Sequence, residues 1–162
     1  GLEPDEEEIE TRRGVFWQPY HDVLAEEIER IKAQHGYVLL YDCHSIRSVL
    51  PRFFEGRLPT LNLGTGDGRS LDPALERTVE EIAAASPYSH ALNGRFKGGY
   101  ITRHYGDPAN NVHALQMELA QDDYMLEEAP FSYLPEKAAA LQPTLKQILD
   151  AMLDFGRRNI VA

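Results

Sequence analysis

The chain has a single cysteine, no long apolar run and fewer basic than acidic residues. Its one cysteine, Cys43, cannot form an internal disulfide, which indicates a reducing compartment. No apolar run approaches the roughly 20 residues that a membrane-spanning helix needs, and no basic stretch followed by an apolar one marks a leader peptide. We therefore expect a cytoplasmic protein without a membrane partner.

The charge of the chain limits its partners further. Its 16 basic and 26 acidic residues give a net charge of -10, which repels phosphates over most of the surface. This charge argues against general affinity for nucleic acid, and the expected partner is a small molecule. The length of 162 residues and the hydrophobic content of 43% fit one globular domain.

Hydrophobic periodicity predicts helices and strands that alternate along the chain. Helices have apolar residues at a spacing of three and four, whereas strands are short apolar or alternating runs. The acidic run Glu3–Glu10 is typical of a solvated helix face or a frayed end, and Pro143 stands near a break in the last helix. The expected helices are Tyr20–His35, Asp72–Ala85 and Pro135–Phe155, and the expected strands are Gly36–Asp42, the start of Thr60–Gly68, Gly99–Tyr105 and Val112–Leu119.

This order of elements predicts the α/β fold class, with residues 1–162 forming a single α/β unit. The continuously apolar run "GYVLLYD" is typical of an internal strand that is covered on both faces. The chain begins with Gly1 and has no initiator methionine, so we expect it to be part of a longer protein.

Polar residues follow the first expected strand, in "YDCHSIRS" (41–48). Asp42 and His44 share one face of this strand, and Cys43 points to the other, where we expect it in the core. Ligands of open α/β sheets bind beyond the carboxyl ends of the strands. His44 is therefore a candidate metal ligand or general base with Asp42 to orient it, although a histidine at a strand end is also commonly only hydrogen-bonded.

A second candidate is Glu118, in "VHALQMELA" (112–120). Strand alternation places it among apolar neighbours, on the same side as Gln116. An ionised carboxylate is costly there unless it is paired, bound to a metal, or working as a base with a raised pKa. The alternative is a salt-bridged glutamate on an edge strand.

Basic residues gather in "NGRFKGGYITRHYG" (93–106), which has no acid in a chain that is acidic overall. Arg95, Lys97 and Arg103 make it the expected place for an anionic substrate, because the arginine fork bonds both oxygens of a carboxylate. A solvated basic edge is the alternative. The glycine-rich "LGTGDG" (63–68) lacks the lysine and hydroxyl residue of a phosphate loop, but Asn62, Thr65 and Asp67 are placed to line a cleft.

Together, "DCHSIRS", "LPTLNLGTGDG", "NGRFKGGYITRHYG" and "VHALQMELAQDDYM" resemble the N-formylglutamate amidohydrolase (deformylase) family of histidine degradation, over about Tyr37–Met125. That family is related to the zinc carboxypeptidases and aspartoacylases. The resemblance implies their fold, a zinc-carboxypeptidase/phosphorylase-hydrolase-like mixed sheet sandwiched by helices. It also implies the metal-dependent hydrolysis of N-formyl-L-glutamate, a small anionic substrate, to formate and L-glutamate.

The resemblance gives these residues roles. His44 would be a protein ligand of a divalent metal, expected to be zinc, with Asp42 behind it. Glu118 would be the catalytic general base. Substrate binding would fall to Arg103, with Arg47 or Arg95, and to Asn62.

One departure from the family concerns its other metal ligands, a histidine in a Ser-Pro-His-Ser-Gly-like turn and a following acid. No such turn precedes Asp42, so the chain holds about one third of a catalytic zinc shell. The chain is then either the C-terminal part of a longer catalytic domain or a degenerate copy of the enzyme. The missing methionine favours the former, and we expect the chain to be inactive by itself. The alternatives are a deacylase of another N-acyl amino acid, a non-catalytic carboxylate-binding domain and a metal-free general-base enzyme.

Overall fold

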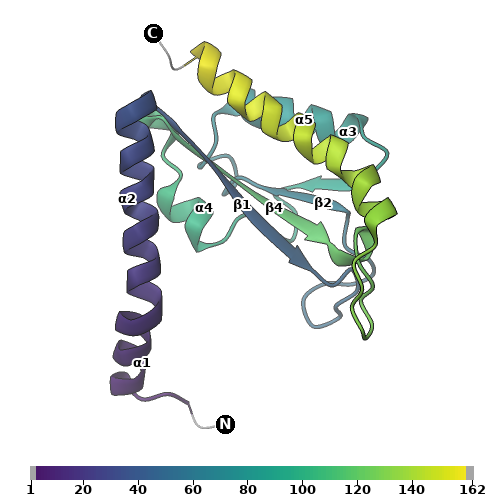
Figure 1. The fold of residues 1–162 in the computed structure, drawn as a ribbon, viewed down its shortest axis with the longest axis horizontal. Coiled ribbons are helices and arrows are strands. Elements are labelled where there is room, and N and C mark those ends of the chain that lie inside the picture. Colours follow the sequence, from purple (N-terminus) through teal and green to yellow (C-terminus); the bar gives the residue numbers. More distant parts are fainter. Residues whose placement is uncertain (1–2, 160–162) are drawn as a thin grey trace.

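The computed structural model describes residues 3–159, which form a mixed sheet between layers of helices (Figure 1). The strand order is β1-β4-β2-β3, where β1 is parallel to β4, β2 is parallel to β3, and β2 is antiparallel to β4. The predicted α/β class with a mixed sheet is therefore confirmed. The strands are β1 (Val38–Ile46), β2 (Leu61–Gly64), β3 (His90–Leu92) and β4 (Val112–Ala120).

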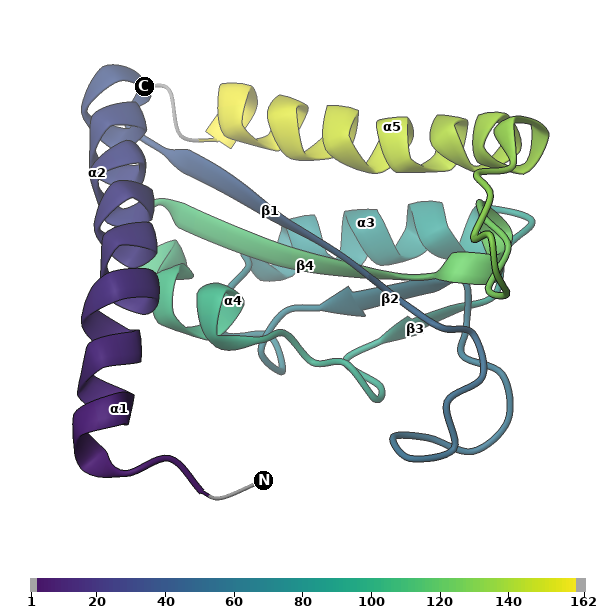
Figure 2. The same ribbon diagram turned by 60° about the horizontal axis from the view of Figure 1, so that its bottom comes forward.

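The helices lie on both faces of the sheet and at one end of it (Figure 2). A long rod stands at that end and consists of α1, the π-helical η1 and α2. None of the described helices is both long and apolar enough to cross a membrane. The helical elements are α1 (Glu6–Arg12), η1 (Arg13–Trp17), α2 (Gln18–His35), α3 (Pro73–Ala85), α4 (Tyr100–Tyr105), η2 (Pro108–Asn110), η3 (Gln121–Asp123) and α5 (Pro135–Asn159).

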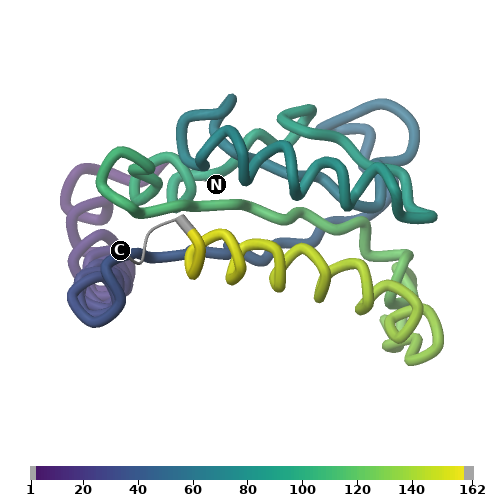
Figure 3. Tube along the Cα trace, turned by 90° about the horizontal axis from the view of Figure 1, so that it is seen from above, coloured from purple at the N-terminus to yellow at the C-terminus, as the bar shows by residue number. Residues whose placement is uncertain are grey.

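The apolar core lies on the face of the sheet that α3 and α5 cover; both helices run along the length of the sheet (Figure 3). Strand alternation sends one set of side chains to this face, and each buried side chain of this size contributes about 1.5–3 kcal/mol by leaving water. The fully buried members include Leu61 and Leu63 of β2, Leu115 and Met117 of β4, Leu75 and Val79 of α3, and Leu141, Ile148 and Met152 of α5.

On the opposite face, an apolar cluster lies where β1 and β4 begin. There Val38 and Val112 pack against Ile28 of α2. Further along the strands, the same face carries Gln116 and Glu118, which alternate with the core residues of β4. The polar half of this face is where the candidate site forms.

Three predicted helices are present, and their termini follow local rules. The helix α2 ends at His35 and is capped by Gly36, whose backbone is left-handed and whose amide donates to the Lys32 carbonyl. Asp72 caps α3 by accepting a hydrogen bond from the amide of Ala74 at 2.7 Å. The acidic run lies in and before α1, with Asp5 as its N-cap.

The prediction of a strand at Gly99–Tyr105 was wrong, because residues 100–105 form α4. Both ends of the segment are tied to β4: the Gly99 amide donates to Gln116 Oε1 at 2.6 Å, and the Asp107 amide donates to the Val112 carbonyl at 2.7 Å. Positions 112 and 116 lie only about 13 Å apart along a strand. An extended segment of nine residues would overshoot that span, so the chain coils despite its strand-forming residues.

Three further expectations differ from the structure. In the described part of the chain, β1 is an edge strand rather than an internal one, and Cys43 near its end is exposed rather than buried. No break occurs at Pro143, because α5 continues through it with this residue on its exposed side. Sequence reasoning also missed β3, whose three residues are too few to show a period.

Gly64 sets the distance between β2 and the loop that carries residues 97 and 98. A Cβ at this position would lie 2.5 Å from the Gly98 nitrogen and 2.7 Å from the Lys97 carbonyl carbon, and backbone cannot yield as a side chain can. We expect Gly64→Ala to lower the free energy of unfolding by about 1–3 kcal/mol, measured by urea denaturation. Gly14→Ala is the control, since nothing lies within 4 Å of its Cβ position; an equal loss in both variants would contradict this account.

Candidate active site

The parallel register of β1 and β4 brings the candidate residues to one face. His44 pairs with Glu118, and Asp42 pairs with Gln116, so all four side chains belong to the same set in the alternation. Residues from two distant segments thus meet near the carboxyl ends of two parallel strands, the edge at which α/β proteins bind ligands.

Asp42 holds the imidazole of His44. Its Oδ1 lies 3.1 Å from His44 Nε2, and the aspartate side chain is 12% exposed whereas that of the histidine is 46% exposed. An acceptor at Nε2 places the proton there and leaves a lone pair on Nδ1. No residue within 3–159 hydrogen-bonds that Nδ1, so it is available to a ligand.

Glu118 is a buried residue, 6% exposed. Burial raises the pKa of Glu118, the nearby His44 opposes that rise, and Asp42 adds to it. Among the described residues none donates a hydrogen bond to this carboxylate, which therefore lacks the partner expected of a structural glutamate. An unpaired carboxyl with a raised pKa suits a general base.

A cleft of about 410 Å³ opens over these residues. The sheet contributes His44, Gln116 and Glu118, and the basic segment contributes the opposite wall. Gln116 joins the two sides, because its Oε1 accepts the hydrogen bond from the Gly99 amide. The opposite wall consists of Arg95, Phe96, Lys97, Gly98, Gly99 and Arg103.

Both arginines of the cleft are held in place but not neutralised. The Nε of Arg95 donates to the Phe53 carbonyl at 2.6 Å, and Arg103 donates to the Gly98 carbonyl. Neither forms an ion pair with a described carboxylate, whereas Lys97 is paired with Asp67 at 2.9 Å. Their positive charge is thus available to an anion, as the sequence suggested.

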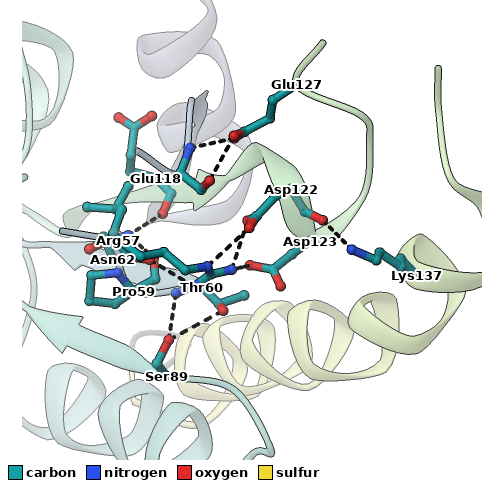
Figure 4. A network of polar contacts seen from close by, with 12 residues as sticks. Arg57, Pro59, Thr60, Asn62, Ser89, Glu118, Asp122, Asp123, Glu127 and Lys137 are labelled. Carbon is teal, nitrogen blue, oxygen red and sulfur yellow. Dashed lines mark hydrogen bonds and ion pairs between the residues drawn. The ribbon is translucent and has the colours of Figure 1, made fainter. Parts of the chain in front are cut away.

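Two predicted substrate-binding residues lie elsewhere. Arg47 donates to Glu128 at 2.6 Å on the exposed surface and does not line the cleft. Asn62 lies on β2 opposite Glu118 of β4, and its amide donates to the carbonyls of Pro59 and Glu118 at 2.7 and 3.0 Å. Figure 4 shows the carboxylate of Glu118 pointing away from this network. Asn62 thus supports the backbone of Glu118, and its buried Oδ1 has no hydrogen-bond partner in 3–159.

Sequence reasoning gave no role to two residues of the cleft. Gln116 and Phe96 were present in the quoted motifs without an assigned function. Alternation did place Gln116 on the side of Glu118, and that signal was sufficient to include it.

The residues present supply part of a metal site. His44 offers one nitrogen, and the buried Oδ2 of Asp42 has no partner among the described residues. No group of three or more His, Cys, Asp or Glu side chains within 3–159 is placed to hold an ion. Since a catalytic zinc takes three protein ligands, the described residues fit one ligand and its supporting carboxylate, not a whole shell.

Burial of Glu118 predicts a pH-dependent cost to stability. Its pKa is higher in the folded chain than the ordinary value of about 4.3, so the folded state binds more protons and loses stability as pH rises through the folded pKa. Glu118→Gln removes this loss. We expect the variant to gain stability relative to the wild type between pH 4 and pH 7 in urea unfolding. Glu136→Gln, on the exposed surface of α5, is the control, and a difference independent of pH would contradict the assignment.

Comparison with known proteins identifies the family. The family model of N-formylglutamate amidohydrolase matches residues 2–125. The chain is 52% identical over 160 residues to the N-formylglutamate deformylase of Pseudomonas aeruginosa, covering 98% of the chain and 60% of that protein. It is also 52% identical over 157 residues to the Pseudomonas putida deformylase, covering 96% and 59%.

A solved structure agrees. The N-formylglutamate amidohydrolase of Ralstonia eutropha JMP134 superposes with a TM-score of 0.79 at 26% identity, over 94% of this chain and 55% of that one. The chain thus spans about three fifths of the length of the curated relatives that it matches. The resemblance found in the sequence motifs is confirmed, and the chain belongs to the N-formylglutamate amidohydrolase family.

Proposed function

We propose that the protein hydrolyses N-formyl-L-glutamate to formate and L-glutamate. The observation that carries this proposal is the unpaired carboxyl of the buried residue Glu118, which lies beside His44 on the sheet side of a cleft. The opposite wall of this cleft carries two arginines free of ion pairs with described residues. A base, a candidate ligand and an anion-binding wall are the parts that this hydrolysis needs. The names of the two Pseudomonas relatives support the same substrate.

In the proposed mechanism, Glu118 takes a proton from the water that attacks the formamide carbon. The same carboxyl then returns the proton to the amine of the departing glutamate, a transfer that a raised pKa favours. Arg103 and Arg95 bind carboxylate oxygens of the substrate and hold the formamide beside Glu118. When bound, a divalent metal such as zinc would polarise the formamide and acidify the water.

We propose that His44 holds such a metal through Nδ1, with Asp42 orienting the ring. The 3.1 Å contact between Asp42 and His44 Nε2 supports this arrangement. The remaining ligands would come from outside the described residues. A non-catalytic carboxylate-binding domain is the second candidate function, favoured by the absence of three clustered ligands within 3–159.

Formate release tests the proposed reaction. The assay is run on residues 1–162 and on a polypeptide extended to the length of the relatives. The extended protein is expected to release formate from N-formyl-L-glutamate, and Glu118→Gln is expected to lower kcat about 10²- to 10⁴-fold by removing the base. Glu136→Gln is the matched control. If the protein binds N-formyl-L-glutamate without hydrolysing it, and Glu118→Gln leaves the affinity unchanged, the result would support the carboxylate-binding domain instead. N-acetyl-L-glutamate hydrolysed faster would indicate another deacylase.

Zinc content tests the proposed metal ligand without reference to turnover. We expect His44→Ala to lose zinc affinity in the extended protein, and Asp42→Asn to lose about 10- to 100-fold because the ring is no longer oriented. His35→Ala, an exposed histidine at the end of α2, is the control. Equal zinc retention by all three variants in competition with a chelator would refute the assignment of His44.

A further inference from the structure

A second, smaller cavity lies on the other side of Arg103. Its volume is about 150 Å³, and Gly66, Arg69, Ser70, Arg103 and Gly106 line it. Arg103 also lines the candidate active site, so one residue borders both spaces. A cavity of about this size has room for a benzene-sized group, which is enough for a carboxylate with one or two methylenes.

The two arginines give this cavity a positive charge that no described carboxylate neutralises. Arg69 donates only its Nε, to the Gly66 carbonyl at 2.7 Å, and Arg103 donates one terminal nitrogen to the Gly98 carbonyl. The acids nearest in sequence have other partners: Asp67 pairs with Lys97, Asp72 accepts from the Ala74 amide, and Asp107 accepts from the Asn110 side chain. Terminal N–H groups of both forks therefore remain free within 3–159, and such groups match a carboxylate.

The fold fixes the position of this pair. Ser70 is joined to Ala114 of β4 by two hydrogen bonds, from the Ala114 amide at 2.7 Å and from the Ser70 hydroxyl at 2.8 Å. Gly106, which follows α4, lies so close that a Cβ there would be 2.8 Å from the Ser70 Cα. The turn carrying Arg69 and the helix carrying Arg103 are thereby packed together on β4, so the site is built before any ligand arrives.

The strand also gives the distance to the reacting groups. Ala114 precedes Glu118 by four residues on β4, which corresponds to about 13 Å. In N-formyl-L-glutamate, five bonds separate the formyl carbon from the side-chain carboxyl carbon, about 6 Å when extended. The side chains of Glu118 and of the two arginines extend into the space between these points and span the rest of the roughly 13 Å. One substrate molecule can therefore reach from the base to this cavity.

We infer that Arg69 and Arg103 bind the side-chain carboxylate of the substrate and select acidic N-formyl amino acids. This inference rests on the proposed function and extends it with a specificity residue, Arg69. In this arrangement Arg95, which lines the cleft but not the smaller cavity, binds the α-carboxylate of the substrate.

Binding of glutarate tests the cavity without any turnover. By calorimetry we expect residues 1–162 to bind glutarate more tightly than butyrate. Arg69→Met is expected to weaken glutarate binding about 10- to 100-fold, the value of charge-assisted hydrogen bonds. Arg77→Met, an exposed arginine of α3, is expected to bind as the wild type does. Absent glutarate binding, or equal binding by Arg69→Met and the wild type at matched unfolding midpoints, would overturn the inference. Arg69→Lys keeps the positive charge but loses the planar fork, so its affinity for glutarate is expected to lie between those of the wild type and Arg69→Met.

Kinetics separate the two proposals. In the extended protein, Arg69→Met is expected to lower kcat/KM for N-formyl-L-glutamate about 10- to 100-fold through KM, with little change for N-formyl-L-glutamine. Formate release with unchanged selectivity in Arg69→Met would overturn the inference and leave the proposed function standing. Glutarate binding through Arg69 in a protein that releases no formate would keep the carboxylate site and contradict the proposed function.

Discussion

The parallel pairing of β1 with β4 determines the rest of the site. Nine residue pairs join the strands from Val38↔Val112 to Ile46↔Ala120, and their register places His44 beside Glu118. A slip of one residue would turn Glu118 and Gln116 into the apolar core and expose Leu115 and Met117. The hydrophobic layer under α3 and α5 therefore holds the register, and the register brings the polar groups of the opposite face together.

The unsatisfied polar groups on one face of the sheet lower the stability of the fold, and the apolar core on the other face offsets this loss. Glu118 is a buried residue whose carboxylate accepts no hydrogen bond within 3–159, and the Oδ2 atom of Asp42 is buried without any partner among the described residues. Leaving a buried polar group unsatisfied costs about 1–3 kcal/mol. Such costs persist where a site needs groups free to bind a ligand or exchange a proton. The same reasoning applies to Arg69 and Arg103, whose charge has no partner within 3–159.

Much of this arrangement could be predicted from sequence periodicity. Alternation gave the shared face of Asp42 and His44 and that of Gln116 and Glu118, and helical spacing gave α2, α3 and α5. The order of four short motifs indicated the family. Each of these motifs, including those that carry His44, Glu118 and the basic segment, is a continuous run of residues that can be recognised without the fold. These features depend on short-range patterns that survive without knowledge of the fold.

The features that failed depend on long-range contacts. α4 has strand-forming residues, but its ends are tied to β4 too closely for a strand. Nothing local shows that β1 lies at the edge of the described sheet, which leaves Cys43 exposed, or that Glu128 lies beside Arg47. Arg69 follows the glycine-rich turn 63–68, where the sequence indicated cleft-lining residues but gave this arginine no role, and the packing of Gly106 on Ser70 brings it to Arg103.

The central claim is that the substrate lies between the polar face of the sheet and the basic segment. Its most direct test is a titration of N-formyl-L-glutamate into the ¹⁵N-labelled Glu118→Gln chain, followed by amide chemical shifts. The account predicts shifts at Gly98, Gly99 and Gln116, which border the cleft, and smaller changes along α3 and α5. Shifts confined to α3 and α5, or none at saturating ligand, would contradict it.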